Sequence, residues 1–218
     1  MVNTVEISYM NAKDMEEWLK ADFKFPPNSK GQPWAGRVSP ETINLLVARR
    51  HRNLINPAIF YMKATDRETK EIVAGPKWHH IIPQSLTSCE DNDLVPTQPP
   101  EEHTTAELRL LESAKHHRQA IVGNRPYLHL TNLSTRLQYR GRGAASTLIR
   151  WGLELADELQ LDVFAEAHEA SKTLYEKFGF RAVNQFEMET GQNGAEKVLR
   201  LYVSDNFSVV SLLRRFFT

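Results

Sequence analysis

One stretch decides the fold of this chain: Leu133-Ser134-Thr135-Arg136-Leu137-Gln138-Tyr139-Arg140-Gly141-Arg142-Gly143-Ala144-Ala145-Ser146. It joins a predicted strand, Tyr127–Thr135, to the helix with the clearest pattern, Gly141–Leu159, whose apolar residues recur at helical spacing. Arginine and glycine alternate where that helix begins, over residues 140–143. A strand that enters a helix through a glycine turn is typical of sites that bind phosphate groups.

This turn suits a pyrophosphate. The first amides of a helix have no partners within it and lie at the positive end of the helix dipole, so together they favour an anion. Gly141 and Gly143 have no side chain, which lets phosphate oxygens approach the backbone closely. Arg140 and Arg142 add hydrogen-bond donors and positive charge. The pattern therefore predicts a pyrophosphate site at residues 140–145.

Other phosphate-binding turns fit the stretch less well. A P-loop requires Lys and then Ser or Thr after its last glycine, whereas Gly143 is followed by Ala144 and Ala145. The dinucleotide fingerprint needs Gly or Ala where Ser146 stands, and that fold prefers the motif after its first strand. A turn whose glycines only permit a tight backbone is the structural alternative.

The stretch resembles the GNAT superfamily of acetyl-CoA-dependent N-acyltransferases, whose motif is [Gln/Arg]-x-x-Gly-x-[Gly/Ala] at the start of a helix. Two frames fit, Gln138–Gly143 and Arg140–Ala145. The second frame is preferred, because it places Leu148 and Ile149 where the family has paired apolar residues.

The resemblance implies which residues hold acetyl-CoA: backbone groups at the end of the strand would bind the pantetheine arm, and backbone amides of the turn would bind the pyrophosphate. The predicted residues are Leu133, Ser134, Thr135, Arg140, Gly141, Arg142, Gly143, Ala144, Ala145 and Ser146. Thr135 departs from the family's usual Val or Ile, and Leu137 from a common Pro, but neither change removes a backbone contact.

A second motif follows at the expected separation. Leu174-Tyr175-Glu176-Lys177-Phe178-Gly179-Phe180 is similar to the family's signature L-Y-x-K-x-G-F, and it comes after the predicted strand Leu161–Ala165. The resemblance, which covers roughly residues 127–183, implies that the Tyr175 hydroxyl protonates the leaving thiolate of coenzyme A. The alternative is a core tyrosine. His168 stands where the family often has an asparagine that contacts the cofactor.

An attacking amine must lose a proton, and His129 is the first candidate for the base. Histidine titrates near neutral pH, and His129 lies eleven residues before Arg140, where some members of the family place a catalytic Glu or His. Strict alternation would put it on one strand face with Tyr127, Thr131 and Leu133. The alternative is a histidine that only hydrogen-bonds within the sheet.

Glu166, which ends the next strand, is the second candidate for the base. His79 and His80 end an earlier apolar run and are expected to line the acceptor site, whereas Trp78 beside them is expected in the core. The predicted catalytic set is His129, Tyr175 and Glu166.

The whole pattern is β-α-α-β-β-α-β-α-β-α-β-β, which predicts a mixed α/β fold with helices on both faces of a central, mostly antiparallel sheet. One GNAT-like domain spans residues 1–218, with a loop-and-helix insertion at about residues 85–122. The proline-bearing loops at residues 24–37 and 85–102 are expected to cover the acceptor site.

Composition narrows the class of protein. The 218 residues include 27 basic and 27 acidic ones, and this balance argues against nucleic-acid binding through bulk positive charge. Cys89 is the only cysteine, which excludes an internal disulfide and favours the cytoplasm. The sequence contains no apparent signal peptide or membrane span, and the expected chemistry needs no metal.

The motifs concern the acetyl donor and do not identify the acceptor. Neutral charge favours a small-molecule amine, acetylated by direct transfer in a ternary complex by a monomer or homodimer. A protein lysine or N-terminus is the alternative acceptor, and a catalytically silent acyl-CoA sensor is the alternative function.

Overall fold

The computed structural model describes residues 4–22, 40–82, 116, 118–189 and 195–203. Several predictions from the sequence lie outside these residues: both loops expected to cover the acceptor site, most of the insertion, Cys89, the turn at residues 191–194 and the C-terminal apolar segment. The first part of the helix expected before the central strand also lies outside them, whereas its end at residues 118–122 is helical.

The described elements follow the predicted order. They are β1 Val5–Tyr9, α1 Ala12–Asp22, α2 Pro40–Asn53, β2 Ile59–Asp66, β3 Ile72–Ile81, β4 Tyr127–Thr135, η2 Leu137–Tyr139, α4 Ala144–Leu159, β5 Asp162–His168, η3 Glu169–Ser171, α5 Lys172–Glu176, β6 Arg181–Glu189 and β7 Ala195–Val203.

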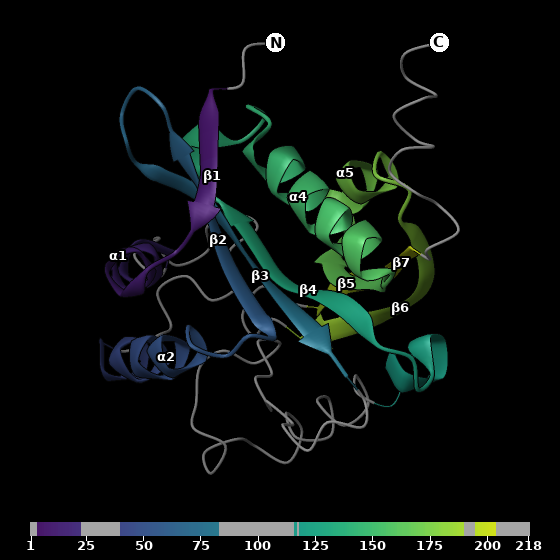
Figure 1. Ribbon diagram of the computed structural model, residues 1–218. Helices are drawn as coiled ribbons and strands as arrows, with labels where there is room; N and C mark the ends of the chain where they lie inside the picture. The colour runs from purple at the N-terminus through teal and green to yellow at the C-terminus, as the bar shows by residue number, and fades with distance from the viewer. Residues whose placement is uncertain (1–3, 23–39, 83–115, 117, 190–194, 204–218) are drawn as a thin grey trace.

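The strands of the described residues form one seven-stranded sheet in the order β1-β2-β3-β4-β5-β7-β6. Neighbouring strands are antiparallel except β4 and β5, which are parallel. Helices α1 and α2 lie on one side of the sheet, and α4 and α5 lie on the other (Figure 1). The predicted mixed, mostly antiparallel sheet with helices on both faces is confirmed.

The face of the sheet that packs against α4 is apolar. Leu128 and Leu130 of β4 lie in one buried cluster with Ile149 and Leu153 of α4. Trp78, which is fully buried as predicted, belongs to the same cluster. A Cβ atom built at Gly152 would collide with the Trp78 ring, so only glycine lets the helix approach β3 this closely.

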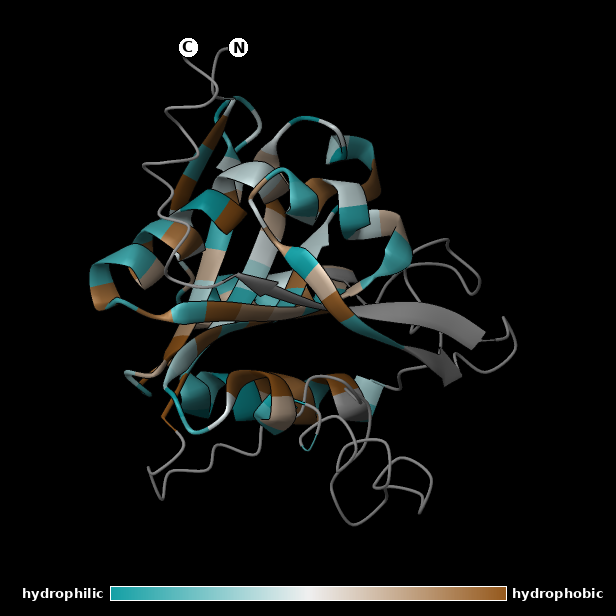
Figure 2. Ribbon diagram, turned by 90° about the vertical axis from the view of Figure 1, so that its right-hand side faces the viewer, coloured by the Kyte–Doolittle hydropathy of each residue, from teal (hydrophilic) through white to brown (hydrophobic). Residues whose placement is uncertain are grey.

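The opposite face carries α1 and α2. Trp18 and Leu19 of α1 pack with Leu46 of α2 and with Ile59 and Tyr61 of β2. Hydrophobic and hydrophilic residues alternate along strands such as β1 (Figure 2), as expected for a sheet whose residues point to its two faces in turn.

A bulge interrupts this alternation in β4. Trp78 pairs with Leu130 but Lys77 pairs with Asn132, so Thr131 is an extra residue in β4. Leu133 therefore packs with the apolar clusters on the α4 side, like Leu130. The expectation that Leu133 shares a face with Tyr127 and His129 is wrong, because the bulge shifts the alternation by one position.

Candidate active site

The predicted phosphate turn forms the entry to α4. Gly141 and Gly143 have φ angles of 77° and 89°, a backbone region that side-chain-bearing residues rarely adopt. A Cβ atom built at either glycine would meet no heavy atom of the described residues within 4 Å. The turn therefore has both the conformation and the open space that a closely approaching phosphate requires.

The first amides of α4 are available to an anion. Gly143 is the N-cap residue, and among the described residues no side chain caps the helix. The Thr147 hydroxyl bonds instead to the Gly143 carbonyl at 3.0 Å. Because a helix of 16 residues points its positive end at this exposed turn, the geometry fits a pyrophosphate.

Both arginines of the turn are exposed, but each has a contact that orients it. Arg140 Nε donates to the Thr135 carbonyl at 3.3 Å. The Arg142 guanidinium lies 5.1 Å from the centre of the Tyr139 ring. Positive charge is thus held at the rim of the turn.

The strand that leads into the turn has a backbone edge beyond its paired part. β4 pairs with β5 only over Tyr127–Leu130, opposite Asp162–Ala165, although both strands continue. Residues Leu133, Ser134 and Thr135 lie past the last pair, and on their other edge they pair with β3. Backbone groups that face the diverging β5 can therefore bind an extended ligand as an added strand would.

His129 and Glu166 lie on the same face of the sheet, the one that carries α1 and α2. His129 pairs with His79 on β3 and with Phe164 on β5, whose ring centre is 5.4 Å away. Glu166 is two residues further along β5 than Phe164, so it shares that face. Both candidates for the base therefore flank the point where β4 and β5 diverge.

Glu166 forms an ion pair with Arg118. The two side-chain atoms are 3.2 Å apart, and the side chains are only 4% and 13% exposed, respectively. Burial raises the pKa of the nearby Tyr127 phenol, and the positive charge of Arg118 partly offsets this effect. Buried charges require such partners. Glu166, Arg118 and Tyr127 therefore form a polar cluster on the α1–α2 face.

Tyr175 lies on the other face of the sheet, the one that packs against α4. It lies in α5, it is buried, and its ring meets Phe180 edge to face at 5.2 Å in the apolar cluster that also includes α4. Burial raises its pKa, so the hydroxyl stays protonated. The sheet thus separates Tyr175 from His129 and Glu166, and the diverging ends of β4 and β5 lie between them.

The two histidines of β3 point to different faces. His79 pairs with His129 and faces the α1–α2 side, whereas His80 pairs with Leu128 and faces the α4 side. Burial lowers the pKa of His80. Of the two, only His79 shares the face of both base candidates.

Sequence reasoning missed several residues of this region. Lys77 is 1% exposed and its ammonium lies 5.9 Å from the Tyr61 ring centre. A lysine inside an apolar strand run was the available signal. Arg118 gave none, because its partner Glu166 is 48 positions away in the sequence.

The described residues contain no cluster of three or more His, Cys, Asp or Glu arranged to hold a metal ion. None of their helices has both the length and the hydrophobicity to cross a lipid bilayer.

Comparison with known families gives a match to the acetyltransferase (GNAT) domain over residues 111–197. This range includes the phosphate turn and the Tyr175 motif. No curated protein matches the chain.

Solved structures share the fold at low sequence identity. A histone acetyltransferase HPA2-related acetyltransferase from Corynebacterium glutamicum has a TM-score of 0.58 at 17% identity, covering 92% of this chain and 96% of its own. Arabidopsis thaliana NAA60 in complex with acetyl-CoA has a TM-score of 0.56 at 14%, covering 94% and 100%. A mutant form of the spermidine/spermine N-acetyltransferase SpeG from Vibrio cholerae has 0.57 at 13%, covering 97% and 98%. Residues 111–197 therefore match the acetyltransferase (GNAT) domain, and the chain as a whole shares the fold of these acetyltransferases.

Proposed function

We propose that the protein transfers the acetyl group of acetyl-CoA to an amine by direct transfer in a ternary complex. The observation that carries the proposal is the turn at residues 140–145, whose first four residues are exposed and which presents the uncapped start of α4 beside the open edge of β4. The solved complex of NAA60 with acetyl-CoA supports the choice of donor.

Each candidate residue has a role in this proposal. Acetyl-CoA supplies the acetyl group as a thioester, and backbone amides of β4 beyond Leu130 stabilise negative charge on the acetyl oxygen. His129 accepts the proton of the amine, with Glu166 as the second candidate. Tyr175, kept protonated by burial, donates its proton to the departing sulfur.

A small-molecule amine is the proposed acceptor. The balanced charge of the chain and the full-length similarity to the fold of SpeG, whose name gives spermidine and spermine as substrates, support this choice. The structure from Corynebacterium glutamicum, whose name includes a histone acetyltransferase, supports a protein or peptide amine as the alternative acceptor.

Binding of acetyl-CoA tests the turn directly. Gly143→Asp places a carboxylate at a positive φ and at the proposed phosphate site, so we expect calorimetry to show a Kd raised about 100-fold or more. Gly123→Asp is the matched control, since Gly123 is also exposed, has a φ of 70° and has open space around it. Equal affinities for the two variants would refute the phosphate-turn assignment.

Transfer itself is tested by release of free thiol from acetyl-CoA with a panel of polyamines, amino acids and peptides that carry a free N-terminus or lysine. Turnover with polyamines or amino acids supports the proposed acceptor, and turnover with peptides alone supports the alternative. Tight acetyl-CoA binding with no turnover on any amine would favour a sensor of acyl-CoA.

A further inference from the structure

Tyr139 lies between the phosphate turn and the core. It ends η2, immediately before Arg140, and it is only 8% exposed. Its ring packs in a buried cluster with Val73 of β3 and with Ala144 and Leu148 of α4. The four exposed residues 140–143 are therefore held between two buried positions, Tyr139 before them and Ala144 after them.

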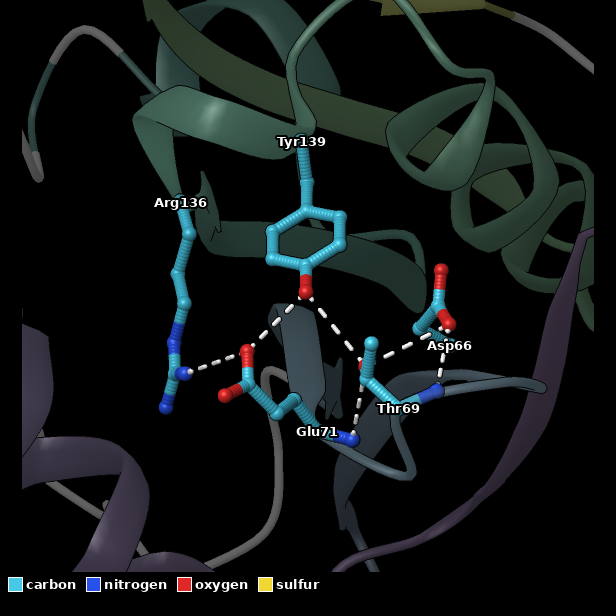
Figure 3. Close-up of polar contacts among 5 residues, drawn as sticks. All are labelled: Asp66, Thr69, Glu71, Arg136 and Tyr139. Atoms are coloured by element: carbon cyan, nitrogen blue, oxygen red, sulfur yellow. Dashed lines mark hydrogen bonds and ion pairs between the residues drawn. The ribbon is translucent and has the colours of Figure 1, made fainter.

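The hydroxyl of Tyr139 points away from the turn and toward the connection between β2 and β3 (Figure 3). It donates a hydrogen bond to Glu71 Oε2 at 3.0 Å, and it lies 3.3 Å from the hydroxyl of Thr69. Both partners, Thr69 and Glu71, belong to a segment that lies about 70 residues before Tyr139 in the sequence. The network thus ties the cofactor turn to a separate part of the fold.

The β2–β3 connection is itself rigid. The Asp66 carboxylate accepts hydrogen bonds from the amides of Glu68 and Thr69 at 3.0 and 2.9 Å. Backbone bonds from Asp66 N to the Glu71 carbonyl and from Lys70 N to the Asp66 carbonyl close the turn. Thr69 and Glu71 are therefore presented to Tyr139 by a turn whose own polar groups are satisfied.

Arg136 completes the network on the other side of Glu71. Its guanidinium is 3.6 Å from Glu71 Oε2, and its amide bonds to the Val73 carbonyl at 2.9 Å. Glu71 therefore contacts residues at both ends of the short segment Arg136–Tyr139. This arrangement fixes the path of the chain from β4 into the turn.

We propose that Tyr139, held by Glu71 and Thr69, is a positioning residue that presets the turn for acetyl-CoA. The inference rests on the proposed function. A turn that is already ordered does not have to lose conformational freedom on binding, so its affinity is higher. Because the hydroxyl faces the β2–β3 connection, the network acts on donor affinity and leaves the chemical step unchanged.

Tyr139→Phe is the central test, because it removes only the hydroxyl and keeps the ring that packs on Ala144. We expect the Kd and the KM for acetyl-CoA to rise about 5- to 10-fold, the effect of one hydrogen bond. The kcat and the KM for the acceptor should stay within about twofold. Tyr9→Phe is the matched control, since Tyr9 is 60% exposed and its ring contacts Trp151 edge to face.

Two substitutions of Glu71 separate positioning from general stability. Glu71→Gln keeps an oxygen that can accept from Tyr139, so we expect donor affinity close to that of the wild type. Glu71→Ala also removes the contact with Arg136, so it should weaken binding at least as much as Tyr139→Phe. The double variant should bind no more weakly than Glu71→Ala alone, because that variant has already lost the contact with Tyr139.

Several outcomes would overturn the inference. One is a Tyr139→Phe or Glu71→Ala variant with a lower melting temperature but an unchanged Kd and KM for acetyl-CoA, which would make the network merely structural. A fall in kcat with an unchanged donor KM would also contradict it. A wild-type protein that fails to bind acetyl-CoA would instead refute the proposed function, and with it the inference.

Discussion

The two faces of β4 differ in kind although they belong to one strand. Leu128 and Leu130 point into an apolar core against α4. Tyr127 and His129 point to the other side, where Glu166 and Arg118 form a buried ion pair. Burying charge is costly unless it is paired, so the polar cluster around Glu166 on the α1–α2 side of the sheet indicates chemistry, whereas the apolar cluster against α4 provides stability.

The comparison predicts that substitutions on the two faces will fail in different ways. Changes in the apolar cluster against α4 should alter the free energy of unfolding, whereas changes to the polar residues around His129 and Glu166 should alter turnover. The experiments below set one face against the other, from the largest expected effect to the smallest.

Glycine-to-alanine substitutions probe how tightly each face is packed. At Gly152 the new Cβ would collide with the Trp78 ring, which cannot move within the core, so we expect a loss of about 3 kcal/mol in the free energy of unfolding. At Gly75, on the α1 side, the Cβ would lie 2.6 Å from the flexible end of Met10, and we expect a loss of about 1 kcal/mol. Urea unfolding measures both, and equal losses would contradict the contrast.

Two histidines on opposite faces probe catalysis. His129→Ala should lower kcat about 100-fold, the usual contribution of a general base. His80→Ala should leave kcat within about threefold, because His80 faces the α4 side. Steady-state kinetics at saturating acetyl-CoA measures both effects. If His129→Ala retains full turnover while Glu166→Gln does not, the base is Glu166.

Tyr175 is an exception to this contrast, since it lies in the apolar cluster against α4 but is proposed to protonate the leaving thiolate. Tyr175→Phe should lower kcat about 10-fold with little change in stability. Burial raises its pKa, so the wild-type phenol loses its proton only above the ordinary value of 10.0. A pH–rate profile should therefore show no basic limb from Tyr175 below that pH, and a limb below pH 10 that disappears in Tyr175→Phe would contradict the raised pKa.

The smallest expected effect is that of Asp66 on the pH dependence of stability, and it concerns neither of the two faces compared. Hydrogen bonds from the Thr69 amide, and then from Glu68, lower the pKa of Asp66 below its ordinary value of 3.8. The ionised carboxylate therefore stabilises the fold above that pH, and this contribution is lost as the pH falls through the folded-state pKa. Asp66→Asn should make the free energy of unfolding less dependent on pH below about 4, as acid titration of urea midpoints would reveal.

Much of the fold was predictable because local patterns fix it. The bounds of β4 and the alternation of arginine and glycine before α4 follow from residues close together in sequence. The bulge at Thr131 was not predictable, because an extra residue is defined only by its pairing with Lys77 and Trp78 on another strand. The same is true of the side of the sheet that Tyr175 occupies, which depends on how α5 packs after β5.

The candidate site was likewise predictable only in the part that depends on local sequence. The glycine turn is a local backbone property, and its open geometry is the one that the sequence indicates. The polar face depends on partners that are distant in sequence, such as Arg118 with Glu166 and Tyr139 with Glu71. Such pairs leave no spacing pattern, so they became visible only in three dimensions.

The short pairing between β4 and β5 has a mechanical consequence. Strands β1–β4 and strands β5, β7 and β6 are two half-sheets, and four residue pairs join them along the strand direction. That seam is the narrowest connection in the sheet, and any molecule seated on the open edge of β4 extends it. A ligand bound between the diverging ends of β4 and β5 would therefore stiffen the whole protein, in addition to supplying a reactant.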